Sequence, residues 1–217
     1  MYNTTVIIKT NNMEEDLFYG NISYKMKEKS KSMDEDLERF YDKYTNDIYL
    51  YPDLYKTALE IDLLINKIEL NLIESDVYYQ MDIDLKSYLK KVSLEKGINE
   101  KEFNHILKYL DKIAPLIIRL KEYWNRARPY QYANLIEAPL YPMTTFSGHS
   151  PSYPSGHTLQ GYVWARLITT IKPELKEWSE SIATKINLSR IALGVHFPSD
   201  IDFSKKIYKD IVSSKLI

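Results

Sequence analysis

Apolar residues recur every three or four positions along most of the chain. This spacing places them on one face of a helix that has 3.6 residues per turn. Glycine, which weakens helices, occurs only six times among 217 residues. The clearest apolar stripe consists of Ile106, Tyr109, Leu110, Ile113, Ile117 and Leu120. The sequence therefore predicts an all-α fold, a single-domain helical bundle.

The same periodicity gives the expected boundaries of the helices. Residues 1–30 are predicted to form an irregular N-terminal segment, in which Thr4–Lys9 is a candidate short strand. Residues 31–217 are predicted to form the helical domain. Pro115 is expected inside one helix, where it is a candidate kink. The predicted helices are 33–48, 53–74, 82–96, 99–128, 155–171, 174–194 and 198–214.

Composition excludes several classes of protein. The net charge of −1 argues against a nucleic-acid partner, which usually requires a basic surplus. The absence of cysteine excludes disulfides. The longest apolar runs, such as Ile113–Ile118, are far shorter than the ~20 residues of a membrane span. The N-terminus lacks a signal-peptide pattern, so we expect a soluble, cytoplasmic protein, and a periplasmic or secreted location stays open as the alternative. The oligomeric state is left open, and a homo-oligomer is compatible with the sequence.

Three short segments combine cationic side chains, histidines and a helix start. They are Lys121–Pro129 (KEYWNRARP), Pro154–His157 (PSGH) and Ser189–Asp200 (SRIALGVHFPSD). A protein that transfers a phosphoryl group needs cations and N–H groups around the phosphate oxygens, a nucleophile in line, and an acid for the leaving group. The three segments contain a candidate for each role.

The first two segments predict an anion site. Lys121 and Arg128 lie seven residues apart, which is two turns on nearly the same face of the predicted helix 99–128, and Pro129 ends that helix. Ser155 is the expected N-cap of the helix 155–171. Free N–H groups at this helix start favour an anion, and Gly156 allows close approach of the backbone.

The third segment supplies the remaining groups. Arg190 falls on the inward face of the helix 174–194, and a buried guanidinium needs a partner, for which a bound phosphate is suited. His196 precedes Pro198, and Asp200 follows four residues after His196. The Asp200 carboxylate is close enough to hold one ring nitrogen of His196, which leaves the other nitrogen free to attack.

These motifs resemble the type 2 phosphatidic acid phosphatase superfamily, which includes soluble class A acid phosphatases and vanadium haloperoxidases. The family signature is K-x6-RP, then PSGH, then SR-x5-H-x3-D, and its eleven fixed residues occur here in order and at the family spacings. The match covers roughly residues 115–205, and residues 1–100 contribute no family motif. The resemblance implies a helical bundle of the phosphatase and haloperoxidase type.

The resemblance also implies a role for each motif residue. His196 would be the nucleophile that forms a phosphohistidine, Asp200 would orient it, and His157 would be the general acid and base. No metal or other cofactor is implied for phosphate hydrolysis, and the expected partner is a small phosphate ester. The implied phosphate ligands are Lys121, Arg128, Ser155, Gly156 and Arg190.

Other interpretations of these residues stay open at this point. Taken alone, Lys121 and Arg128 are typical of a solvated helix face. His196 and Asp200 could cap a helix or bind a metal, although three nearby cations and the lack of cysteine disfavour a metal. His149 belongs to a second Ser-Gly-His sequence in the predicted loop 130–154 and is interpreted as a rim or surface residue. His105 is interpreted as structural or solvent-facing.

Two alternative functions also follow from the motifs. A vanadium haloperoxidase would bind vanadate in the same cradle, and such enzymes are usually much longer than this chain. An anion-binding module without catalysis is the second alternative, and the complete set of motif residues argues against it.

Overall fold

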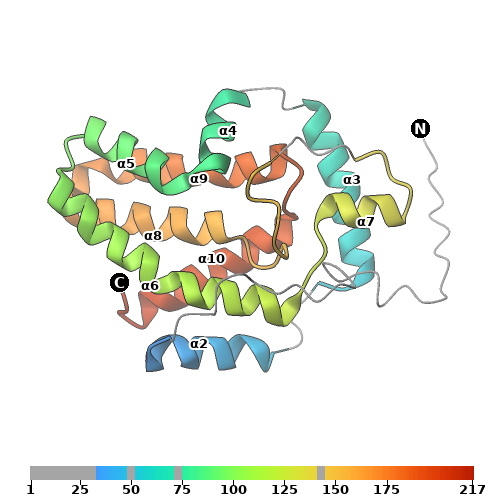
Figure 1. Cartoon of the computed structure of the whole chain (residues 1–217), viewed down its shortest axis with the longest axis horizontal. Helices are drawn as coiled ribbons and strands as arrows, with labels where there is room; N and C mark the ends of the chain where they lie inside the picture. The colour runs from blue at the N-terminus through green and yellow to red at the C-terminus, as the bar shows by residue number, and fades with distance from the viewer. Residues whose placement is uncertain (1–32, 48–51, 71–74, 141–144) are drawn as a thin grey trace.

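The described part of the chain is built from helices. A computed structural model of the chain describes residues 33–47, 52–70, 75–140 and 145–217 (Figure 1). Within these ranges the regular elements are α-helices and one short 3₁₀ helix, which confirms the all-α prediction. The elements are α2 (Glu35–Thr45), α3 (Leu54–Leu70), α4 (Ser75–Ile83), α5 (Leu85–Glu95), α6 (Glu100–Trp124), α7 (Pro129–Leu135), α8 (Gly156–Ile171), η2 (Pro173–Leu175), α9 (Lys176–Ala192) and α10 (Pro198–Ser213).

Helix α8 lies at the centre of the bundle. It packs against α6, α9 and α10, which surround it in Figure 1. Its apolar face is fully buried at Leu159, Val163 and Ile168. Gly161 lets α8 approach α9 closely, because a Cβ atom at this position would lie 3.0 Å from Cδ1 of Ile186. The start of α8, where the PSGH motif lies, is therefore held by the core of the fold.

Helix α6 carries the apolar stripe that the sequence predicted. Ile106, Leu110, Ile113 and Leu120 are completely buried. Asn99 caps the helix by accepting a hydrogen bond from the backbone N–H of Glu102, and the Glu102 side chain accepts one from the Asn99 N–H in return. The helix continues past Pro115 to Trp124. Its length carries the Lys121 side chain to the end of the bundle where the other motifs lie.

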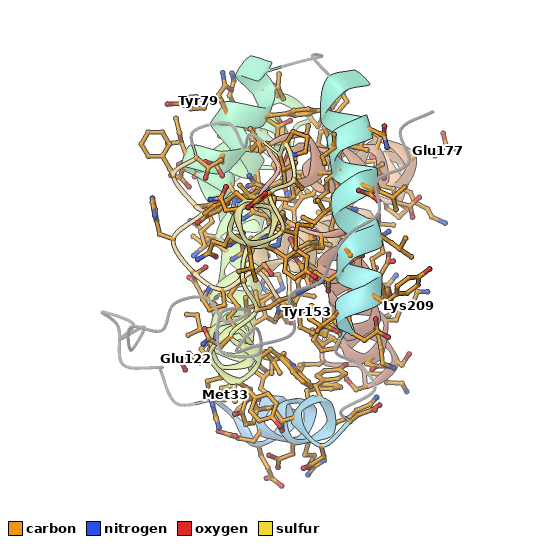
Figure 2. All side chains as sticks on the ribbon, turned by 90° about the vertical axis from the view of Figure 1, so that its right-hand side faces the viewer. Met33, Tyr79, Glu122, Tyr153, Glu177 and Lys209 are labelled. Carbon is orange, nitrogen blue, oxygen red and sulfur yellow. The ribbon has the colours of Figure 1, made fainter. Side chains whose placement is uncertain are left out.

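Helix α2 packs along α6 and is also tied to α10 (Figure 1). The Tyr44 hydroxyl donates a hydrogen bond of 2.7 Å to Asp210, and the Tyr44 ring meets Phe203 edge-on at 5.3 Å between centroids. The other face of Phe203 stacks on Tyr153, with centroids 4.4 Å apart. Tyr153 is 1% exposed and lies in the interior in Figure 2, so the segment that leads into α8 is anchored in the core.

Several predicted boundaries were wrong. The predicted helix 82–96 is interrupted at Asp84, which caps α5 by accepting from the backbone N–H of Ser87 at 3.1 Å. The predicted helix 53–74 is described as far as Leu70. Residues 71–74, and the segment 1–30 with its candidate strand, lie outside the described residues.

The largest correction concerns the end of α6. The predicted helix 99–128 ends at Trp124, because Asn125 takes a left-handed conformation with φ 42° and ψ 37°. Arg128 is extended, as expected before a proline, and Pro129 starts the new helix α7. The first part of the predicted loop 130–154 therefore lies in α7, which continues to Leu135. Lys121 and Arg128 do not share a helix face.

None of the helices described here is both long enough and apolar enough to cross a membrane.

Candidate active site

The three sequence motifs meet at one end of the bundle. The backbone N–H of Ser155 donates to the carbonyl of Asp200 at 3.3 Å, and the Ser204 hydroxyl donates to the Ser155 carbonyl at 2.9 Å. These bonds hold the start of α8 against the start of α10. An Arg128 N–H donates to the Val195 carbonyl at 2.7 Å, which brings the first motif to the third. The convergence that the motif spacing predicted is present in the structure.

His196 and Asp200 form a buried pair at the start of α10. Nδ1 of His196 lies 3.0 Å from Oδ2 of Asp200, and the same oxygen accepts the backbone N–H of Phe197 at 2.9 Å. Nε2 of His196 lies 3.0 Å from a terminal nitrogen of Arg128. A guanidinium can only donate, so Nε2 must accept and Nδ1 must carry the proton. This tautomer leaves a lone pair on Nε2, which faces the cationic side of the site.

The surroundings of the pair keep His196 neutral and Asp200 ionised. Burial, followed by the nearby charge of Arg128, holds the pKa of His196 well below its usual range, although Asp200 acts in the opposite direction. Burial alone would raise the pKa of Asp200. The Arg126 cation and the hydrogen bond from His196 outweigh burial and lower that pKa to about 2. A neutral imidazole beside a carboxylate is the form needed for attack.

Lys121 and Arg128 approach the site from different directions. Lys121 points from the last turn of α6 and donates to the carbonyl of Pro151. Arg128 donates through Nε to the Ser150 carbonyl at 2.7 Å. Both side chains are buried, and burial, together with the charge of Arg128, lowers the pKa of Lys121 well below its usual range. The charges of Lys121 and Arg128 act against each other, and an anion bound between them would relieve that repulsion.

The N-terminus of α8 forms the next wall of the site. Ser155 is its N-cap, as predicted, and accepts from the Thr158 backbone N–H at 3.4 Å and from the Thr158 hydroxyl at 2.9 Å. Gly156 packs against α6, because a Cβ atom there would lie 3.2 Å from Cγ2 of Ile117. The first-turn N–H groups of this helix are oriented to bind a negative charge.

His157 lies in the first turn of α8 and is partly buried. Burial, followed by the charge of Arg190, holds its pKa well below the usual range, and Asp82 opposes this effect. Lys121 and Arg128 lower the pKa further, which places His157 near all three cations of the site. The His157 ring makes no hydrogen bond to the described residues, so its nitrogens are free to contact a substrate.

Arg190 is completely buried and already has a carboxylate partner. Its guanidinium donates to Asp82 of α4 at 2.7 Å, and neither side chain is exposed. Asp82 also accepts the backbone N–H of Phe146 at 2.5 Å and the hydroxyl of Ser147. The sequence interpretation expected a phosphate as the partner of Arg190 and missed Asp82. Asp82 lies in a helix whose sequence shows no motif. Its role becomes visible only in the structure, where α4 packs against α9.

The sequence interpretation also missed an ion pair behind Asp200. Arg126 and Glu60 are 3.1 Å apart, with side chains 3% and 6% exposed. Arg126 lies inside the first motif, but the six positions between Lys121 and the Arg-Pro pair are variable in the signature. Glu60 lies on α3, in the half of the chain without a family motif.

The two remaining histidines lie outside the cluster. His149 is exposed on the segment that follows Phe146, and His105 is exposed on α6. Phe146 is 55% exposed and meets Tyr79 edge-on at 5.6 Å between centroids. Tyr79 lies at the outer edge of the molecule in Figure 2. The two aromatic rings therefore border the segment that contacts Asp82.

Comparisons with known proteins match the segment that carries the three motifs. Residues 112–204 match the model of the PAP2 superfamily. A non-specific acid phosphatase from Providencia stuartii is 28% identical over 94 residues, which cover 43% of this chain and 38% of that enzyme. A transmembrane PAP2-type phosphatidylglycerolphosphate phosphatase from Bacillus subtilis has a similar fold. Its TM-score is 0.52 at 18% identity, over 83% of this chain and 94% of that structure. The segment that contains every predicted site residue thus belongs to the PAP2 superfamily.

Proposed function

We propose that the chain is a phosphomonoesterase that hydrolyses small soluble phosphate esters without a metal. The observation that carries the proposal is the environment of His196: Nδ1 is bound to Asp200, and Nε2 faces Arg128 at 3.0 Å. A nucleophile oriented by a carboxylate and aimed at a cationic anion site fits phosphoryl transfer. The superfamily match and the acid phosphatase relative support phosphoester hydrolysis.

In the first proposed step, Nε2 of His196 attacks phosphorus and the P–O bond to the alcohol breaks. Lys121, Arg128 and Arg190 neutralise the phosphoryl oxygens, and the N–H groups that start α8 bind them. A bound phosphate dianion offsets the cations that lower the pKa of His157, so His157 takes up a proton when the substrate binds. It gives this proton to the leaving oxygen, and the alcohol departs uncharged. The proton stays on Nδ1 of His196, where it is hydrogen-bonded to the Asp200 carboxylate. The negative charge of Asp200 stabilises the positive charge that develops on the phosphorylated ring.

In the second step, water attacks the phosphohistidine. His157, now neutral, takes a proton from the water while the P–N bond breaks. The electron pair of that bond returns to Nε2, which restores neutral His196 and releases inorganic phosphate. An alcohol could replace water in this step, and the product would then be a new phosphate ester.

The test is hydrolysis of p-nitrophenyl phosphate, with and without EDTA. We expect turnover that EDTA leaves unchanged, because three cationic side chains already neutralise the phosphate. Orthovanadate should inhibit competitively, since it adopts the five-coordinate geometry of the transition state. Loss of activity with EDTA that a divalent metal restores would contradict the metal-independent mechanism.

A parallel assay with vanadate, bromide and peroxide tests the haloperoxidase alternative. Halide oxidation there, with no ester hydrolysis, would replace the phosphatase proposal. If orthovanadate binds but neither reaction occurs, the site is an anion-binding module.

A further inference from the structure

Asp200 is held on its far side by a second guanidinium. Arg126 donates to Oδ1 of Asp200 at 2.6 Å and to the Ser199 hydroxyl at 2.7 Å. This oxygen is the one that does not contact His196, because Nδ1 of His196 lies against Oδ2. The Arg126 guanidinium also lies 3.9 Å from the centre of the Phe197 ring. Arg126 therefore fixes the position of the Asp200 carboxylate. It also determines that Oδ1 binds Arg126 while Oδ2 is left for His196.

Glu60 shares the same guanidinium with Asp200. The other terminal nitrogen of Arg126 donates to Glu60 at 3.1 Å and to the Thr57 hydroxyl at 3.0 Å. Glu60 also accepts the backbone N–H and the hydroxyl of Ser199, each at 2.6 Å. One cation thus lies between two buried carboxylates. The contacts run without interruption from Glu60 to Arg126, from Arg126 to Asp200, and from Asp200 to His196.

We propose that Arg126 is a positioning residue for His196 that acts through Asp200, and that Glu60 moderates the effect of its charge. This inference rests on the proposed role of His196 as the nucleophile. Arg126 does not touch the reacting nitrogen, which lies on the opposite side of the imidazole ring from Asp200. Its contribution is to orient Asp200 and to balance the charge of this carboxylate, so that His196 stays neutral with its proton on Nδ1.

The charges around the pair determine the direction of the effect. His196 faces Asp200, Arg128 and Lys121, and Asp200 faces Arg126 on its other side. Without the Arg126 charge, the Asp200 carboxylate would be less balanced and would attract a proton to His196 more strongly. Without the Glu60 charge, Arg126 would act on Asp200 more strongly, and His196 would bind a proton less readily. Removal of the Arg126 charge should therefore raise the pKa of His196, and removal of the Glu60 charge should lower it.

The test compares Arg126→Gln, Glu60→Gln and Arg126→Lys with the unmodified chain. The first readout is the ring ¹⁵N signal of His196 as a function of pH, which reports its protonation and tautomer without requiring activity. The second is the acid limb of kcat/KM for p-nitrophenyl phosphate. We expect Arg126→Gln to raise the pKa of His196 by about one pH unit or more, since nearby opposite charges shift a pKa by about 1–3. The acid limb should move upward with it.

The other two variants separate charge from position. Glu60→Gln should lower the pKa of His196. Arg126→Lys keeps the charge, so it should leave that pKa near the unmodified value. A lysine cannot bind both carboxylates as a fork, so kcat/KM should fall while KM changes little. If Arg126→Gln does not fold, Glu60→Gln still tests the proposal. The proposal expects this variant to lower the pKa of His196, whereas a merely structural role of Glu60 would not lower it.

Asp210→Asn is the structural control. Asp210 joins α10 to α2 by accepting from Lys43 at 2.8 Å and from Tyr44 at 2.7 Å, away from the motifs. This variant should lower the unfolding midpoint and leave the titration of His196 unchanged. The proposal is overturned if folded Arg126→Gln titrates like the unmodified chain, or if Glu60→Gln raises the pKa as Arg126→Gln does. Absence of ester hydrolysis with the expected ¹⁵N shifts would contradict the proposed function, and it would leave standing only the coupling of Arg126 and Glu60 to the protonation of His196.

Discussion

The Arg128 guanidinium lies 3.0 Å from Nε2 of His196 and donates a hydrogen bond to it. Because arginine has no acceptor, Nε2 carries the lone pair, and the proton lies on Nδ1 beside Asp200. The same arginine is a candidate ligand of the phosphate. A phosphoryl group bound by Arg128 would be placed next to this lone pair, which becomes available for the proposed attack once the Arg128 N–H donates to the phosphate instead.

Replacement of His196 by alanine should abolish turnover, since His196 is the proposed nucleophile and alanine cannot form the covalent intermediate. In the unmodified chain, acid quenching with labelled substrate should trap a phosphoenzyme whose label is lost in acid and kept in base. That stability pattern is the one expected of phosphohistidine. A phosphoenzyme that survives acid would show that another residue is the nucleophile.

Replacement of His157 by alanine should impair substrates with poor leaving groups most. An alkoxide needs a proton as the P–O bond breaks, whereas p-nitrophenolate is stable without one. General acid catalysis contributes ~10²–10⁴-fold, so kcat/KM should fall by about that factor for an alkyl phosphate and much less for p-nitrophenyl phosphate. The measurement is kcat/KM for both substrates in each variant.

His149→Ala is the matched control, because His149 ends the second Ser-Gly-His sequence and is exposed. It should show no dependence on the leaving group. If the two variants behaved the other way round, the general acid would have to be reassigned to the rim segment.

The motifs and the helical core could be predicted because both depend on local sequence. The stripe from Ile106 to Leu120 is buried as the period requires, and Ser155 caps its helix as a serine before a helical pattern should. The end of α6 was missed because Asn125 in a left-handed conformation ended the helix before Pro129 could do so. Asparagine tolerates this conformation, but its identity alone does not require it.

The carboxylates behind the site were not predictable in the same way. Asp82 and Glu60 lie on α4 and α3, and their partners Arg190 and Arg126 lie far along the chain. No local spacing links residues that are brought together only by packing. The buried cations did require partners, so the sequence indicated that acids must exist without showing which ones.

Acidification should destabilise the fold through His196. Its folded pKa lies well below the ordinary value of 6.5, so below about pH 6.5 the unfolded chain binds a proton that the folded chain does not. Stability is therefore lost as the pH falls through this window. One proton corresponds to about 1.4 kcal/mol per pH unit. His196→Asn should reduce the slope of unfolding free energy against pH by about that amount near pH 5.5, measured by urea denaturation in a phosphate-free buffer. Equal slopes would contradict a neutral, buried His196.

Asp82→Asn should destabilise the fold strongly. Asp82 and Arg190 are both fully buried at 2.7 Å, and removal of one partner leaves a buried charge without balance. Such losses cost about 3–5 kcal/mol. Asp111→Asn is a suitable control, because the Lys86–Asp111 pair is also close, at 2.5 Å, but its side chains are 41% and 56% exposed. An exposed pair contributes about 0–1 kcal/mol. The two free energies of unfolding, measured by urea denaturation, should differ accordingly. Similar small losses in both variants would mean that Arg190 finds another partner when Asp82 is neutral, and that Asp82 is not needed to hold this arginine in place.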